Sequence, residues 1–535
     1  MSDILLIQPP VVKATEPPLS LAVLTAALQK QGHPVTVVDA NLDAFLYLLS
    51  AEQLTELSGP NPTTSIHRAL RHRQASLDLL RSPAAGTSFA RYSTAVRHLN
   101  RLLTLWCRDD KAERLTLGNY RNQQYSVFAP DDLEKFVNGT ARTLFRRYFQ
   151  EQLLPQFAQS PPKLIALSIN YLHQALPAFE LAGLLRRQFP AATLVAGGGL
   201  ITSWQRPLRQ LNLRLPPFDH LVFGPGEAPL VSLATEQAAS EYFLADAGSI
   251  GFCPDFDFAR LGEYFSPEPV LPVSSSRGCY WQNCLFCPEA VAPVHPYQAF
   301  APEDFPLLLS TLSKQHKVRN FHLTDNAIPV NILRGLAARR DDLQGLRWFG
   351  FVRFEPILEN GDFVQQLSQA GCCILQLGLE SGSQQVLDRL GKGITVASAK
   401  KILGNLHEAG IAAYVYIMLG TPGETEADAE MTLDFLEAEA EKIAFLNISI
   451  MNLPRSSGML DDPAQYGMTE AQLQDERSEL GLYQRYQVSG DWDRSAARRF
   501  LHKRLLGSAV IRERVNRKPP MFTSNHSLFF LNGLK

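Results

Sequence analysis

The chain has 535 residues, 45% of them hydrophobic, which is enough to bury two or three separate cores. Its 51 Lys and Arg residues nearly balance its 53 Asp and Glu residues, and the formal net charge of -2 does not indicate a nucleic-acid-binding surface. The opening sequence MSDILLIQPP has neither the charged start of a signal peptide nor an apolar run long enough to span a bilayer. We therefore expect a cytoplasmic protein with no membrane segment.

Short apolar runs that alternate with helical patterns predict an α/β domain over residues 1–245. ILLIQPP and VTVVDAN flank a helical stretch, and LIALSIN, ATLVAGGG and HLVFGPGE continue the alternation. This order predicts a five-stranded, parallel, doubly wound sheet. At about residues 51–160 the apolar positions fall three or four apart, which predicts an inserted helical subdomain.

Strands and helices alternate again over residues 265–455. About six βα units follow one another, which predicts a parallel (β/α) barrel or part of one. The reacting groups of such barrels lie at the carboxyl ends of the strands. In this sequence those ends carry Cys279, Asp325, Arg353, Glu380 and Gly420.

Residues 456–535 form a C-terminal extension with mixed helical and irregular signals. Aromatic residues gather near its end, and we expect them to dock on the barrel. Together with the helical insertion, Phe522, His526 and Phe529 are candidates for closing the site against water.

Three of the seven cysteines fall within nine positions, in CYWQNCLFC. Cys279, Cys284 and Cys287 can therefore direct three thiolates from one loop toward a common centre, which suits an iron–sulfur cluster or zinc. A four-iron cluster held by three cysteines leaves one iron open to a small chelating molecule. Zinc would need a fourth ligand, such as His295.

The other four cysteines are expected to be ordinary buried thiols. They are Cys107, Cys253, Cys372 and Cys373.

With this loop, GLESGS at 378–383 and YIMLGTPGET at 416–425, the sequence resembles the radical S-adenosylmethionine (SAM) superfamily, specifically the branch with an N-terminal cobalamin-binding domain. The resemblance covers about residues 1–50 and 160–455. It implies a [4Fe–4S] cluster that cleaves SAM to a 5'-deoxyadenosyl radical. Most members place three residues between the first two cysteines, whereas this chain has four.

The resemblance also implies which residues contact SAM. Phe286 would pack on the adenine, the alternative being an anchor of the loop in the core. Asp325 would accept hydrogen bonds from the amino group, the alternative being a cap on the following helix. Arg353 would pair with the carboxylate, the alternative being a structural ion pair.

Two later motifs complete the expected SAM site. Glu380 would accept from the ribose hydroxyls, and Ser381 would bind a carboxylate, a role compatible with helix capping. Gly420 and Pro422 would shape a turn that lets the backbone approach the adenine.

The front domain resembles cobalamin-binding domains in the small residues at its strand ends. The expected positions around the cofactor are Gln8, Pro9, Pro10, Ser168, Gly197, Gly198 and Gly199. Each could instead serve only to shape a loop. The motif DxHxxG is absent from the sequence, so a cobalt ligand of that type is not expected.

With cobalamin, the resemblance implies methylation of an unactivated carbon. Without it, the same barrel would catalyse a rearrangement, cyclisation or oxidation. A zinc-stabilised binding protein is the alternative from a different class. The family implies an electron donor such as flavodoxin or ferredoxin, and a small molecule or a peptide as substrate; the sequence does not identify the substrate or a catalytic side chain.

Overall fold

The computed structural model describes residues 3–107, 112–235, 242–244, 253–287, 289, 297–473, 478–488 and 490–534. His295, the alternative zinc ligand, lies outside these residues. The chain forms two compact units. The first holds residues 1–270, 476–480 and 520–522, and the second holds residues 271–475, 481–519 and 523–535. Across the described helices, none has the length and apolar character needed to cross a bilayer.

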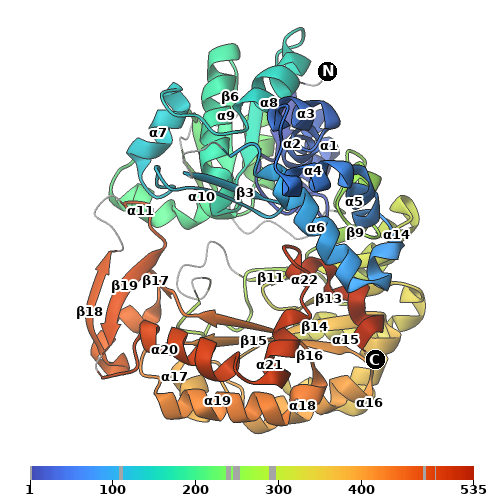
Figure 1. Ribbon diagram of the computed structural model, residues 1–535, viewed down its shortest axis with the longest axis vertical. Helices are drawn as coiled ribbons and strands as arrows, with labels where there is room; N and C mark the ends of the chain where they lie inside the picture. The colour runs from blue at the N-terminus through green and yellow to red at the C-terminus, as the bar shows by residue number, and fades with distance from the viewer. Residues whose placement is uncertain are drawn as a thin grey trace. The chain divides into compact units, whose positions relative to one another are not determined.

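The first unit is built on a six-stranded parallel sheet (Figure 1). In sheet order, its strands are β2 (Val35–Val38), β1 (Ile4–Ile7), β5 (Leu164–Ser168), β6 (Thr193–Gly197), β7 (His220–Phe223) and β8 (Tyr242–Leu244). The prediction of a parallel, doubly wound sheet is confirmed, and β8 is one strand more than expected. All four residues of β1 are buried, as its continuous apolar run requires in a sheet covered on both faces.

Helices cover this sheet through apolar side chains. Leu21 and Leu28 of α1 (Leu19–Lys30) and Leu230 of α12 (Glu227–Ala234) pack against strand residues that include Ile4 and Leu6. Further helices of the fold are α9 (Ala175–Gln188), α10 (Gly199–Ser203) and α11 (Gln205–Gln210).

The insertion between β2 and β5 is largely helical, as predicted. Its main helices are α2 (Ala40–Leu48), α3 (Ala51–Ser58), α4 (Thr64–Arg71), α5 (Arg73–Leu80), α6 (Phe89–Leu103) and α7 (Pro130–Asn138). The apolar positions behind this prediction are buried at Tyr92, Val96, Leu99, Leu103 and Trp106, whereas Phe89, at the start of α6, is exposed. A hairpin of β3 (Glu113–Thr116) and β4 (Asn119–Asn122) was not predicted, because four-residue strands are too short to show a clear alternation.

The second unit contains the predicted partial barrel, an open six-stranded sheet (Figure 1). In order, the strands are β16 (Ile443–Ile450), β15 (Ala412–Leu419), β14 (Cys372–Glu380), β13 (Arg347–Val352), β12 (Asn320–Leu323) and β9 (Val270–Val273). Strands β12 to β16 run parallel. The connecting helices include α14 (Asp304–His316), α15 (Val330–Ala338), α16 (Gly361–Gln369), α17 (Gln384–Arg389), α18 (Val396–Glu408) and α19 (Glu426–Ala438).

The C-terminal extension docks on the end of β15. The Tyr486 hydroxyl donates to the Gly420 carbonyl at 2.9 Å, and Trp492 Nε1 donates to Glu424 at 3.0 Å. The extension contains helices α20 (Arg494–Phe500), α21 (Ala509–Asn516) and α22 (Thr523–His526). Two of its strands, β18 (Met468–Leu473) and β19 (Tyr483–Val488), form an antiparallel sheet with β17 (Leu453–Pro454), which lies just before the extension, and this sheet was not predicted.

The proposed closing role of the last aromatic residues is wrong for His526 and Phe529. Their rings contact each other beside Leu528, whose carbonyl accepts a hydrogen bond from Arg347 at 2.6 Å. Arg347 is the first residue of β13, so this part of the tail lies at the amino end of the strand. The candidate site lies at the carboxyl ends. Phe522 belongs to the first unit.

Helix α15 lies so close to a neighbouring loop that Gly335 has no room for a side chain. A Cβ there would collide with the Pro302 carbonyl oxygen, whereas a Cβ at Gly404 of α18 would meet nothing within 4 Å. We expect Gly335→Ala to lower the free energy of unfolding by about 1–3 kcal/mol. Gly404→Ala should raise it by about 0.5–1 kcal/mol, because alanine is the better helix former. Urea unfolding followed by circular dichroism measures both, and equal shifts would contradict the close packing.

Candidate active site

The three clustered cysteines lie on the loop after β9 and the short strand β10 (Ser276–Arg277), and all three are half-buried. Two hydrogen bonds fix the loop, from Leu285 N to the Leu390 carbonyl at 3.0 Å and from the Ser457 hydroxyl to the Leu285 carbonyl at 2.6 Å. Burial raises the pKa of the Cys284 thiol, and the charges of Lys392 and Arg353 oppose that rise.

Three thiols on one loop fit an iron–sulfur cluster by donor chemistry. Within the described parts of the chain, however, no three Cys, His, Asp or Glu side chains gather closely enough to hold a metal ion. The cluster assignment of Cys279, Cys284 and Cys287 therefore stays a prediction that rests on the donor set.

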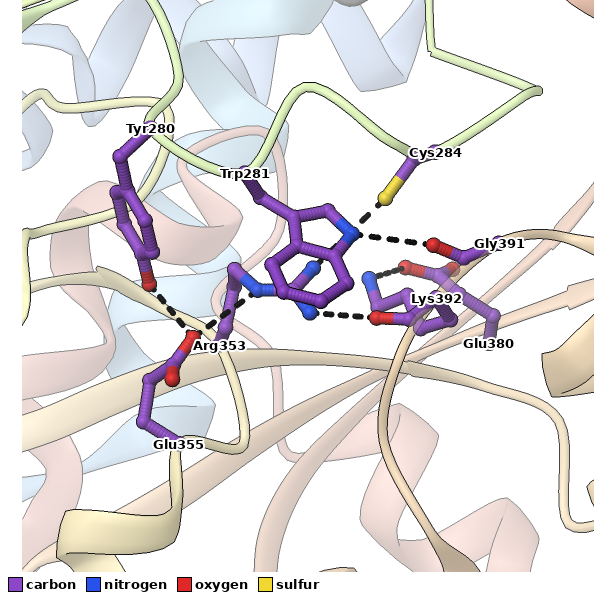
Figure 2. Close-up of polar contacts among 8 residues, drawn as sticks. All are labelled: Tyr280, Trp281, Cys284, Arg353, Glu355, Glu380, Gly391 and Lys392. Carbon is purple, nitrogen blue, oxygen red and sulfur yellow. Dashed lines mark hydrogen bonds and ion pairs between the residues drawn. The ribbon is translucent and has the colours of Figure 1, made fainter.

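Trp281, inside the four-residue spacer, anchors the cysteine loop. Its Nε1 donates to the Gly391 carbonyl at 3.0 Å (Figure 2). Its ring lies so close to Gly393 that a Cβ there would collide with it. The next residue, Gln282, has a φ of 53°, a left-handed conformation that a longer loop needs in order to turn back. The spacing that departs from the usual family pattern is thus accommodated by a defined contact.

Arg353 follows β13 and is almost fully buried. Its Nε donates to Glu355 at 3.1 Å and its Nη2 to the Lys392 carbonyl at 2.5 Å. Its guanidinium also lies over the Trp281 ring, 4.1 Å from the centroid (Figure 2). The ion-pair alternative for Arg353 is therefore the one that the structure shows, and these contacts occupy the guanidinium that was predicted to pair with the SAM carboxylate.

Glu380 ends β14 at an irregularity in the strand. The pairing with β15 shifts between Gly378 and Glu380, and Glu380 has a φ of 70°. Such a bulge redirects a side chain at the end of a strand. The carboxylate folds back over Gly378, where a Cβ would collide with it, and accepts from Lys392 Nζ at 2.8 Å. Lys392 Nζ also lies 5.6 Å from the centre of the Phe286 ring.

Asp325 and Ser381 are buried and already bonded to protein groups. The Asp325 carboxylate accepts from the Ser275 backbone N–H and from the Ser275 and Ser276 hydroxyls, at 2.6–3.1 Å. Asp325 does not cap α15, whose N-cap residue is Pro329. The Ser381 hydroxyl lies 3.1 Å from the Thr432 hydroxyl and accepts from the Ser383 N–H.

The predicted turn after β15 depends on two glycines in the left-handed region. Gly420 has a φ of 71° and Gly423 a φ of 80°, and Pro422 between them is buried. One carboxylate oxygen of Glu424 accepts from the backbone N–H groups of Gly420 and Thr421. Burial raises the pKa of Glu424 to about 7.

The positions predicted to surround cobalamin lie at the carboxyl ends of three neighbouring strands of the first sheet. Gln8, Pro9 and Pro10 follow β1, Ser168 ends β5, and Gly197, Gly198 and Gly199 lie at the end of β6. The chain order reverses between β1 and β5, and ligands of doubly wound sheets bind at such a switch point.

Polar contacts organise this edge of the sheet. Asn170 Nδ2 donates to the Ser168 hydroxyl, Asn170 Oδ1 accepts from the Gly199 N–H, and Gln174 donates to the Pro9 carbonyl at 2.7 Å. Gly198, with a φ of 104°, has no room for a Cβ beside Ile169. The loop-shaping role considered for these residues is thus present in the structure.

A protein-family model matches part of the second unit. Residues 273–436 match the family model described as the Radical SAM superfamily. This segment is a radical SAM domain. The radical SAM domain carries the cysteine loop, Arg353, Glu380 and the turn at Gly420.

Curated relatives match only part of the chain. An uncharacterised methyltransferase of Pyrococcus horikoshii is 25% identical over 186 residues, which are 34% of this chain and 40% of the relative. Bacteriochlorophyllide d C-12(1)-methyltransferase of Chlorobaculum tepidum is 24% identical over 196 residues, or 34% of this chain and 41% of the relative. The chain therefore spans about two fifths of the length of these relatives.

Solved structures share the fold over more of the chain. The radical SAM methyltransferase TsrM from Kitasatospora setae, solved with cobalamin and a [4Fe–4S] cluster, has a TM-score of 0.51 and 17% identity, and the match covers 87% of this chain and 79% of TsrM. The cobalamin-dependent radical SAM enzyme OxsB has a TM-score of 0.57 and 15% identity, with 94% and 66% covered. At these identities the likeness shows the fold.

Sequence reasoning missed four residues around the cysteine loop. They are Tyr280, Trp281, Glu355 and Lys392. The additional residue in the spacer was the one available signal, and it pointed to an unusual loop without indicating which side chain anchors it.

Proposed function

We propose that this radical SAM enzyme binds a [4Fe–4S] cluster through Cys279, Cys284 and Cys287 and is a cobalamin-dependent methyltransferase. The observation that carries the proposal is the cysteine loop of a radical SAM domain, placed after the first strand of a partial barrel, in a chain that also has a doubly wound sheet. TsrM and OxsB, which share this fold, are described as cobalamin-dependent or cobalamin-bound. When bound, the cluster and SAM would supply the radical chemistry.

The residues of the chain would bind and orient these groups. Phe286 and the turn at Gly420 and Pro422 would hold the adenine, Glu380 would accept from the ribose, and Asp325 and Ser381 would support the methionine end. Lys392 would neutralise Glu380 in the absence of ligand, since the two lie 2.8 Å apart. In the first unit, the small residues Gly197 to Gly199 would let a cofactor approach the switch point of the sheet.

The test is anaerobic reconstitution of the full chain with iron and sulfide, followed by iron and sulfide analysis and an assay for 5'-deoxyadenosine from SAM. We expect about four iron atoms per chain and reductant-dependent 5'-deoxyadenosine. A colourless protein that retains zinc instead would refute the proposal. Flavodoxin or ferredoxin should replace the chemical reductant, and a cytoplasmic location would suit such donors.

Cobalamin has a separate test. Hydroxocobalamin added during reconstitution should co-elute with the protein on gel filtration. If it does not, the methyltransferase part of the proposal fails, and rearrangement, cyclisation or oxidation becomes the reaction class to assay.

A further inference from the structure

A buried arginine touches one of the three cysteines. Arg353 Nη1 donates to Cys284 Sγ at 3.7 Å (Figure 2). The same guanidinium contacts Glu355, the Lys392 carbonyl and the Trp281 ring. With four partners around one planar group, the position of this charge next to the sulfur is fixed.

The cysteine loop itself contributes to holding the arginine. Trp281 belongs to the four-residue spacer between Cys279 and Cys284, and its Nε1 bond to Gly391 keeps the indole over the guanidinium. Tyr280, also in the spacer, donates to the same Glu355 oxygen that accepts from Arg353. The unusual spacer thus supplies two of the groups that fix Arg353 beside Cys284.

A fixed cation near a cysteine ligand has a definite electrostatic consequence. Hydrogen bonds to the sulfurs and the net charge around a cluster set its reduction potential. One-electron reduction adds a negative charge to the cluster, and a nearby guanidinium stabilises the reduced form more than the oxidised form. Because Arg353 is buried, water screens this effect less than it would at the surface.

We propose that Arg353, held by the spacer residue Trp281, donates a hydrogen bond to Cys284 that raises the reduction potential of the cluster. This inference rests on the proposed function, because it requires the cluster. The electron comes from the external reductant and goes to the oxidised cluster, and no bond of Arg353 forms or breaks. Glu355 acts in the opposite direction, since its negative charge lies against the same guanidinium.

The test is a redox titration of the reconstituted full chain, monitored by electron paramagnetic resonance of the reduced cluster. At a fixed solution potential, Arg353→Gln should lower the ratio of reduced to oxidised cluster about tenfold, which is a shift of about 59 mV to more negative potential for one electron. Glu355→Gln should shift the potential the other way. Trp281→Leu should shift the potential in the same direction as Arg353→Gln. Without its stacking partner, the guanidinium keeps its charge but is no longer held beside the Cys284 sulfur.

Arg339→Gln is the matched control. Arg339 pairs with Asp342 after the carboxyl end of α15 and is more exposed, so its loss should leave the potential unchanged. Equal potentials for the wild type and Arg353→Gln, with full iron content in both, would overturn the inference and leave the proposed function intact. If Arg353→Gln binds no cluster, the potentials of Glu355→Gln and Trp281→Leu test the inference instead. Unchanged potentials in both variants would overturn the inference. A wild type without a cluster would end both proposals.

Discussion

Cys284→Ala is expected to reduce 5'-deoxyadenosine formation to the rate measured without protein. A four-iron cluster held by three cysteines has no spare protein ligand, so removal of one thiolate should prevent stable assembly. Cys284 is also the cysteine beside Arg353, and the fixed guanidinium would then face a methyl group. The measurements are iron content after anaerobic reconstitution and product formation by chromatography. Iron should fall well below the wild-type value of about four per chain.

Cys253→Ala is the control for this variant. Cys253 is the exposed cysteine of the first unit, and its sulfur lies 4.0 Å from the Pro254 carbonyl oxygen, a weak contact. Its loss should change neither iron content nor product. If Cys284→Ala kept both the iron and the activity, the assignment of the cluster to this loop would be wrong.

The exposure of Cys253 is also a correction, because the sequence predicted a buried thiol there. Cys372 is buried, as expected, while Cys107 and Cys373 are half-buried. A free cysteine behaves as a small hydrophobic residue and is usually buried, but a single position carries no periodicity from which to infer burial.

The architecture was largely readable from the sequence because its central strands are continuous apolar runs. Ile4–Ile7 and Leu164–Ser168 are buried on both faces, so their composition departs clearly from that of the helices around them. The antiparallel strands β18 and β19 were missed because they are not apolar runs, and strand β8 was missed because its three residues are too few to show a pattern. YQRYQV in β19 is half-exposed and polar, and its pairing with β17 and β18 depends on tertiary contacts.

The sequence predicted the parts of the site that belong to a local motif. It did not predict the contacts between segments that lie far apart in the sequence. The cysteines, GLES and the turn at Gly420 lie at strand ends, as the order of motifs implied. The partners of Arg353 come from the spacer, from Glu355 and from the turn at Gly391–Gly393. No local pattern reports that a tryptophan will stack on an arginine 72 positions away, so the sequence left a SAM contact and a structural ion pair as equal alternatives for Arg353.

Lys392→Met is expected to lower the free energy of unfolding by about 3–5 kcal/mol. Lys392 and Glu380 form an ion pair with both side chains largely buried, 8% and 13% exposed. Removal of the ammonium leaves the Glu380 carboxylate at the bulge of β14 without its charged partner, in a place where water screens it poorly. Calorimetric unfolding of the full chain measures the loss, provided that the transition of the second unit is resolved.

Two further variants separate the buried charge from the loss of packing. Lys401→Met removes the ammonium of an exposed pair with Glu359 and should change the free energy of unfolding far less than Lys392→Met does, because water screens the exposed charges. The double variant Glu380→Gln with Lys392→Met removes both charges and should regain most of the stability lost by Lys392→Met alone, because no unpaired carboxylate remains. If the double variant were as unstable as the single one, the cost would come from packing around the methylene chain of Lys392. If the double variant is stable but binds SAM more weakly, the ion pair of Lys392 and Glu380 serves SAM binding and not the stability of the fold.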